Sequence, residues 1–124
     1  MELDPEVDLV VDIQDLTSEF KKLSLTLYRY YKHKAMVESQ MSVAKAKLKE
    51  VKAITRKRIK SENLVKHTES SMEAEIDTDP VVLEAQNKLI RTEHDAATWY
   101  GAVESMKAKK DMLIQLGSDR RKEV

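Results

Sequence analysis

Cysteine is absent from this chain of 124 residues, and glycine and proline occur only twice each. Without cysteine the chain has no disulfide framework, no thiolate metal site and no thiol nucleophile. So few turn formers leave few places for the chain to reverse, which argues against a sheet of many short strands. Apolar residues nevertheless make up 41% of the chain at regular spacing, so the composition argues against disorder as well.

Long apolar runs are also missing. The longest uncharged stretch in the middle of the chain, Ala96 to Val103, is far shorter than the ~18 residues that a membrane-spanning helix needs. The start of the chain, Met1 to Glu6, is acidic, which is the wrong chemistry for a signal or transit peptide. We therefore expect a cytoplasmic protein with no membrane partner.

Charge is abundant, and it is arranged in blocks. The 22 basic and 22 acidic residues cancel to a net charge of zero. Residues 21–67 carry fourteen Lys or Arg and only three Glu, whereas residues 1–20 and 68–106 are acidic. A basic segment between two acidic ones indicates a polyanion partner, pairing between segments, or both.

A seven-residue apolar repeat predicts one long basic helix over residues 13–67. Its core series runs from Ile13 to Arg58, and eleven of the fourteen positions are apolar or Tyr. No glycine or proline interrupts the series, which is typical of a helix with coiled-coil character.

The start of a second helix is marked by Thr78 or Asp79 as a cap and by Pro80 in the first turn. Gly117 is a natural stop, so this helix is predicted over residues 80–117. The remainder of the single domain, residues 1–124, is then an acidic N-terminal segment (1–12), an acidic connector (68–79) and a charged tail (118–124). The N-terminal acids could serve a partner or cover a neighbour's basic residues.

The predicted fold is therefore all-α, a long antiparallel two-helix hairpin that resembles a coiled coil. The apolar stripes are wider than a strict seam, so each helix needs more than one neighbour. We expect hairpins to pack side by side as a homo-oligomer, either a bundle or a ring. The residues expected in the hairpin or oligomer core are Leu27, Met41, Leu48, Val51, Leu89, Trp99, Val103, Met106 and Leu113.

A dense basic band is the first candidate site, and it consists of Lys45, Lys49, Lys52, Arg56, Lys57, Arg58 and Lys60. A structural interpretation is a solvated face paired with acids of the second helix. The band is almost unopposed within its own helix, however, and Arg58 falls where the repeat expects an apolar residue. Repeated around an oligomer, such a stripe would offer phosphate contacts to a nucleic acid.

Base-stacking aromatics would complement such a site, and Tyr28 and Tyr31 are the candidates. Tyr30 shares the core stripe and is expected to pack inside. The three histidines are scattered, and no catalytic or metal-binding motif is present. We therefore expect no enzyme activity, no cofactor and no metal site. The acids of residues 73–79 are interpreted as a solvated loop or as charges that stabilise a helix start.

Several segments of the second half together resemble a known family. They begin with the acidic run Glu73 to Asp79 and end with Leu113 to Leu116; between these lie Val82-Leu83, Leu89, Trp99 and Gly101-Ala102-Val103-Glu104-Ser105-Met106-Lys107. From about Met72 to Arg121 the chain is similar to phage recombination mediators of the UvsY type. Upstream, Arg56-Lys57-Arg58-Ile59 resembles the basic pair of that family, although Lys57 is an addition and no aromatic residue comes directly after Ile59. The first 25 residues match poorly.

The resemblance implies that Arg56 and Arg58 contact DNA. It also implies an oligomer in the host cytoplasm that binds single-stranded DNA and helps to load a RecA-like recombinase onto strands coated by single-stranded-DNA-binding protein. The competing hypothesis is a non-enzymatic coiled-coil adaptor or assembly scaffold that binds no nucleic acid. A membrane-surface helix is disfavoured because the basic stretch lies within a regular coiled-coil seam.

Overall fold

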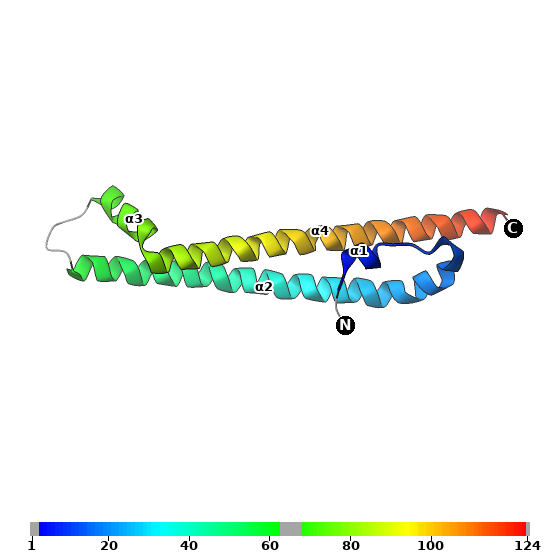
Figure 1. The fold of residues 1–124 in the computed structure, drawn as a ribbon, viewed down its shortest axis with the longest axis horizontal. Coiled ribbons are helices and arrows are strands. Elements are labelled where there is room, and N and C mark those ends of the chain that lie inside the picture. The colour runs from blue at the N-terminus through cyan, green and yellow to red at the C-terminus, as the bar shows by residue number, and fades with distance from the viewer. Residues whose placement is uncertain (1–2, 63–67, 124) are drawn as a thin grey trace. The chain divides into compact units, whose positions relative to one another are not determined.

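The computed structural model describes residues 3–62 and 68–123, and every regular element within them is helical (Figure 1). A short helix α1 (Pro5–Asp8) and a 3-10 turn η1 (Ile13–Asp15) lead into α2 (Leu16–Glu62). They are followed by α3 (Glu69–Thr78) and α4 (Pro80–Glu123). With 47 residues in α2 and 44 in α4, the predicted all-helical fold with two long helices is confirmed.

The first helix boundary is set by a cap. The backbone N–H of Gln14 donates to Oδ1 of Asp12 at 3.0 Å, which starts η1 and delays α2 to Leu16 instead of residue 13. The predicted end of this helix at residue 67 lies outside the described residues. Residues 68–79, predicted as a connector, contain the third helix instead, so that interpretation was wrong.

Helix α3 forms because the connector has a cap and an apolar face. The N–H of Ser71 donates to Oγ1 of Thr68 at 3.1 Å, and Met72 and Ile76, four residues apart, are both buried. Asp79 then separates α3 from α4 with an extended backbone, and its Oδ1 accepts from the N–H of Val81 at 3.0 Å. Helix α4 therefore begins at Pro80, as predicted.

The predicted helix stop at Gly117 is wrong, because α4 continues through the predicted charged tail to Glu123. No described glycine has a positive φ, so Gly117 is an interior helical residue and not a left-handed cap. A Cβ added at Gly117 would lie 3.4 Å from Cε2 of Phe20, which is an ordinary van der Waals contact, so the packing here does not require a glycine. Arg120 and Arg121, in the last turn, favour the negative end of the helix dipole.

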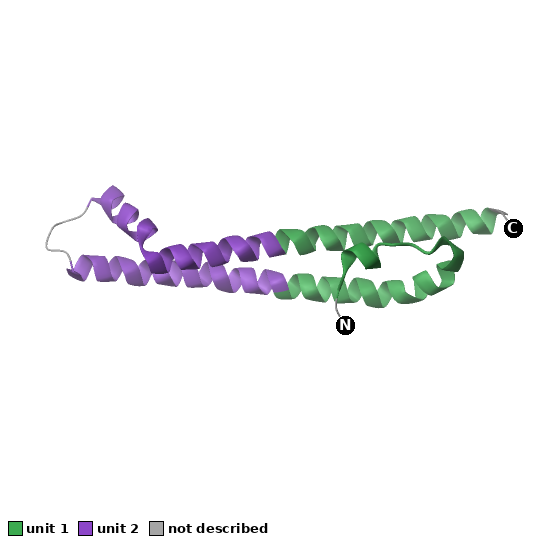
Figure 2. Ribbon diagram, in the orientation of Figure 1, with its two compact units in different colours: residues 1–36, 96–124 green, residues 37–95 purple. Residues whose placement is uncertain are grey.

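The chain divides into two compact units, each with its own apolar core (Figure 2). Unit 1 comprises residues 1–36 and 96–124, and unit 2 comprises residues 37–95. Within each unit a segment of α2 packs against a segment of α4 that runs in the opposite direction (Figure 1). The nine predicted core residues are distributed between the two cores: six are buried, and Leu27, Met41 and Trp99 pack against them half-buried.

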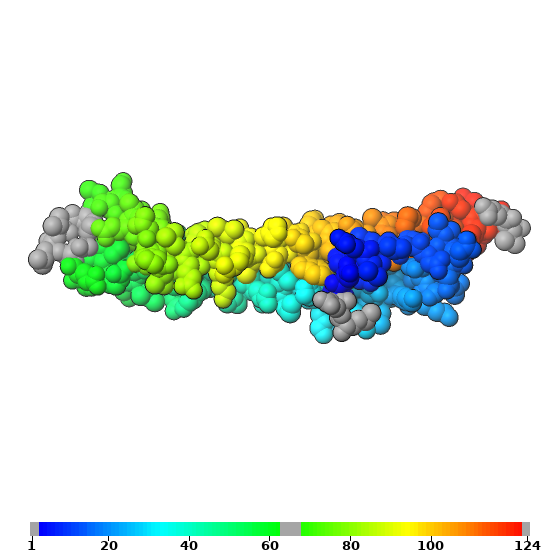
Figure 3. Space-filling view, viewed as in Figure 1, coloured from blue at the N-terminus to red at the C-terminus, as the bar shows by residue number. Residues whose placement is uncertain are grey.

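The N-terminal segment belongs to unit 1, where it lies against α4 (Figure 3). Leu9 and Val11 pack against the unit 1 core. The hydroxyl of buried Tyr30 donates to Oδ2 of Asp8 at 2.6 Å, and Lys109 donates to the backbone carbonyl of Asp8. Within this chain the acidic segment therefore covers its own unit, an arrangement that sequence interpretation did not anticipate.

The core of unit 2 joins all three of its helices. It consists of Ala44, Leu48, Val51, Ile59, Met72, Ile76, Val82 and Leu89. Ile59 takes the last buried position of α2, and the predicted core position Arg58 is exposed. The reason is that a straight α-helix drifts about 20° from a seven-residue frame with every repeat. The strict frame is therefore displaced by one residue near the end of α2.

Candidate nucleic-acid interface

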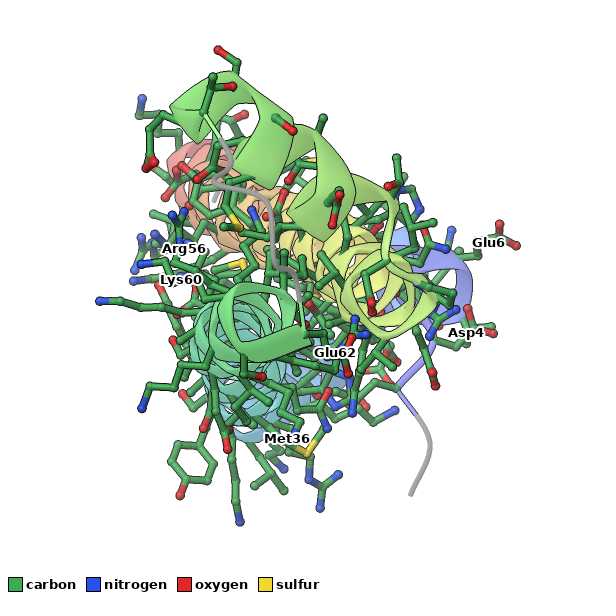
Figure 4. All side chains as sticks on the ribbon, turned by 90° about the vertical axis from the view of Figure 1, so that its left-hand side faces the viewer. Asp4, Glu6, Met36, Arg56, Lys60 and Glu62 are labelled. Atoms are coloured by element: carbon green, nitrogen blue, oxygen red, sulfur yellow. The ribbon has the colours of Figure 1, made fainter. Side chains whose placement is uncertain are left out.

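Five basic residues of α2 lie along one edge of the buried seam of unit 2. Each directly follows a buried residue, so the series keeps the three- and four-residue spacing of one helix face. We call this set the basic stripe: Lys45, Lys49, Lys52, Arg56 and Lys60. In Figure 4 the side chains of Arg56 and Lys60 extend to the same side of α2, beneath α3.

Lys57 and Arg58, predicted in the same band, are not part of the stripe. Successive residues turn by about 100° around a helix, so Arg58 is about 200° from Arg56. Arg58 pairs with Glu62, its Nη1 at 3.5 Å from Oε2, and with Asp79. Lys57 is exposed. The predicted contact set is thus divided between different faces of α2, and the two arginines that the resemblance pairs point to different surroundings.

Helix α3 supplies the acidic partners of the stripe. Nη1 of Arg56 lies 3.2 Å from Oε1 of Glu69, and its Nη2 pairs with Glu73. Nζ of Lys52 lies 4.0 Å from Oδ1 of Asp77. The hydrogen bond to Glu73, with a smaller contribution from Glu69, raises the pKa of the Arg56 guanidinium.

The other three cations of the stripe are Lys45, Lys49 and Lys60. They are exposed, and within residues 3–62 and 68–123 they make no ion pair. The stripe therefore combines cations that are open to an incoming anion with cations already held by carboxylates. Its partners are acids of α3, and not of the long second helix as the structural interpretation expected.

The candidate stacking residues Tyr28 and Tyr31 lie in unit 1 and are 62% and 41% exposed. Nζ of Lys107 lies 5.5 Å from the ring centroid of Tyr31. A hydrogen bond to Tyr31, followed by one to Glu104, raises the pKa of Lys107. Both rings are thus accessible, and a cation accompanies one of them, which suits a stacking surface.

Tyr100 adds a third exposed ring to unit 1, with Nζ of Lys34 at 5.4 Å from its centroid. Sequence interpretation missed it because its position widens the apolar stripe of the second helix. Trp99 instead packs inside, its ring centroid 5.8 Å from that of Tyr30 and 4.1 Å from that of His33. The indole is therefore a core group.

Metal-binding clusters and membrane-spanning helices are both absent from the described parts of the chain. No group of three or more His, Asp or Glu side chains in residues 3–62 and 68–123 is placed to hold a metal ion. No helix in those residues is long and apolar enough to cross a membrane.

Comparison with known proteins identifies a fold. No family model matches the chain, and no curated protein matches its sequence significantly. The crystal structure of a phage recombination mediator, however, has the same long-helix architecture. That protein is UvsY of bacteriophage T4, with a TM-score of 0.83, 14% sequence identity, and coverage of 97% of this chain and 93% of the other. At this identity the likeness shows a UvsY-like fold.

Proposed function

We propose that this protein is a non-enzymatic recombination mediator that binds single-stranded DNA as a homo-oligomer. In this role it helps to load a RecA-like recombinase onto strands that are coated by single-stranded-DNA-binding protein. The observation that carries the proposal is the fold likeness to T4 UvsY, a recombination mediator, over nearly the whole of both chains.

The basic stripe supports the DNA-binding part of this proposal. Its three open lysines, Lys45, Lys49 and Lys60, follow one face of α2, as a track for successive phosphates would require. Exposed Tyr28 and Tyr31 offer faces on which unpaired bases can stack, a preference that distinguishes single strands from duplex. Binding and remodelling of the strand, without chemistry on it, is then the mechanism.

Self-association is supported by apolar side chains that a single chain leaves in water. In unit 2, Val43 and Ile54 of α2 and Leu83 and Ile90 of α4 are all exposed. On α2, Val43 and Ile54 are three full helical turns apart and therefore lie on one line. Burying such stripes against further copies of the chain removes them from water.

Titration of labelled oligo-dT, and of a duplex of equal length, tests the proposal directly. Fluorescence anisotropy across a salt series should show tight binding to the single strand that weakens steeply as salt rises. Light scattering on the same sample should give a mass of several subunits. Absence of binding at ~50 mM salt, where ~6 phosphate contacts are strongly favourable, would refute the mediator function.

One observation favours a second candidate, an oligomeric adaptor or assembly scaffold. Lys52, Arg56 and Arg58 are all paired with carboxylates of the same chain, as expected for a band that serves only to hold helices together. A scaffold would assemble as the mediator does but would leave oligo-dT anisotropy unchanged at every salt concentration. The same pair of measurements therefore separates the two candidates.

A further inference from the structure

Two series of opposite charge face each other in unit 2. On α3, Glu69, Glu73 and Asp77 are four residues apart, and on α2 the series Lys52, Arg56 and Lys60 has the same spacing. Asp77 pairs with Lys52 and Glu73 pairs with Arg56, so these two pairs run in opposite directions in matching register. Glu69 also pairs with Arg56, which leaves Lys60 open. In Figure 4 the side chain of Arg56 extends to the side of α2 on which its α3 partners lie.

From this register we infer that α3 is a built-in competitor for the nucleic acid, with its carboxylates in the places that strand phosphates would take. The inference rests on the proposed function and deepens it, because it assigns a regulator to the DNA-binding stripe. Carboxylate and phosphate oxygens are both preferred partners of a guanidinium, so a strand and α3 compete for Arg56.

The position of α3 is held by apolar contacts and does not depend on the ion pairs. Met72 and Ile76 are buried in the unit 2 core, with Ile76 only 1% exposed. The acids meanwhile remain accessible, since the side chain of Glu69 is 80% exposed and that of Glu73 48%. Arg56 can therefore exchange a carboxylate for a phosphate while α3 stays in place.

The consequence is that the stripe binds a strand less tightly than five free cations would. Three lysines are open to the strand, and two further cations, Lys52 and Arg56, are released only in exchange for carboxylates. When a strand leaves the stripe, the carboxylates of α3 can reoccupy Lys52 and Arg56, so the competitor favours release of the strand. Glu75, on the same short helix, is not required by this arrangement.

The test is a variant that keeps the shape of α3 and removes its charge: Glu69→Gln, Glu73→Gln and Asp77→Asn together. A matched control, Glu84→Gln, Glu93→Gln and Asp95→Asn, makes the same change in net charge with exposed acids of α4 in the same unit. Within the described residues these acids make no ion pair. Circular dichroism should show both variants as helical as the wild type.

Binding of oligo-dT is then measured by anisotropy over a salt series. Each phosphate contact to a single strand contributes ~0.7 to the slope of log affinity against log salt. Two released cations should steepen the slope by ~1.4. Relative to 1 M salt, this tightens binding by up to ~25-fold at ~0.1 M salt. The α4 control should leave the slope unchanged. The double variant Glu69→Gln with Glu73→Gln removes both partners of Arg56 and leaves Asp77 on Lys52, so it should steepen the slope by about half as much.

The outcomes separate the inference from the proposed function. If the wild type binds oligo-dT and the α3 variant has the same slope and affinity as the α4 control, α3 is no competitor and the mediator function still stands. If neither the wild type nor any variant binds at ~50 mM salt, the DNA-binding function itself is refuted, and the competitor with it.

Discussion

The position of the stripe on α2 can be tested with two pairs of lysines from the same helix. Lys49 and Lys60 belong to the basic stripe, whereas Lys47 and Lys57 lie on other faces. Lys49 and Lys60 are eleven residues apart, which is about three helical turns, or ~16 Å along one face. Replacing either pair by alanine lowers the net charge by two, so the pairs differ only in which face loses its charge.

We expect Lys49→Ala with Lys60→Ala to weaken binding of oligo-dT, because two phosphate contacts are lost. At ~0.7 per contact the slope of log affinity against log salt becomes shallower by ~1.4. Relative to 1 M salt, this corresponds to a loss of ~25-fold at ~0.1 M, or about 2 kcal/mol of binding free energy. Alanine is the best helix former, so helicity should be retained.

Lys47→Ala with Lys57→Ala is the control, and it should change the slope by much less. Lys47 has a carboxylate partner on its own helix, with Nζ 3.8 Å from Oε2 of Glu50. Anisotropy across a salt series measures both variants, with light scattering to establish that the subunit number is unchanged. Equal losses for the two pairs would mean that the strand responds to overall charge, and the stripe would be refuted as its track.

Four further predictions concern stability. Tyr30→Phe removes the hydrogen bond to Asp8 and should lower the free energy of unfolding by about 1.5–3 kcal/mol in urea titrations. Burial first, and then Asp8, raise the pKa of the Tyr30 phenol, so the folded state favours its neutral form. That contribution is intact below pH ~10 and lost above it, so ionisation of Tyr30, followed by absorbance, should coincide with loss of ellipticity. Ile76→Ala, at a buried site, should cost ~2–5 kcal/mol in thermal unfolding. Gly117→Ala should stabilise by ~0.5–1 kcal/mol, whereas a left-handed cap at this residue would make the same change destabilising.

The two long helices could be predicted because their apolar residues recur without any turn former between them. A spacing of three and four residues leaves a helix as the one regular structure that buries them together. Trp99, Met106 and Leu113 follow from that spacing alone. The basic band was visible for a related reason, since a dense run of lysines on a helix is readable from composition.

The division of the basic band between different faces of α2 was harder to predict. A frame of seven residues places Arg58 in the core, whereas the structure buries Ile59. An error of one residue is about 100° on a helix, which is enough to exchange a buried position for a flanking one. The extra turn of α4 beyond Gly117 was missed for a different reason. Glycine favours a helix end only on average, and Gly117 has no positive φ and lies in the interior of α4.

The helix in the connector was not predicted, because its sequence is dominated by acidic residues and contains only a short apolar pattern. Met72 and Ile76 are four residues apart, and Thr68 stands where a cap is needed. The cap and the apolar pair span only a few residues, and an isolated helix of ten residues is only marginally stable in water. It is stabilised by the core of unit 2, and that core is assembled from residues far apart in the sequence.

This dependence links the fold of α3 to the balance of charge at the stripe. The chain as a whole is neutral, so a polyanion is attracted by the local arrangement of cations and not by net charge. Burial of Ile76 keeps Glu73 within reach of Arg56, and an exposed ion pair of this kind is weak and sensitive to salt. The charge blocks of the sequence indicated pairing between segments, a polyanion partner, or both. The two are therefore compatible. In the proposed function the same cations serve both, and a strand competes with α3 for them.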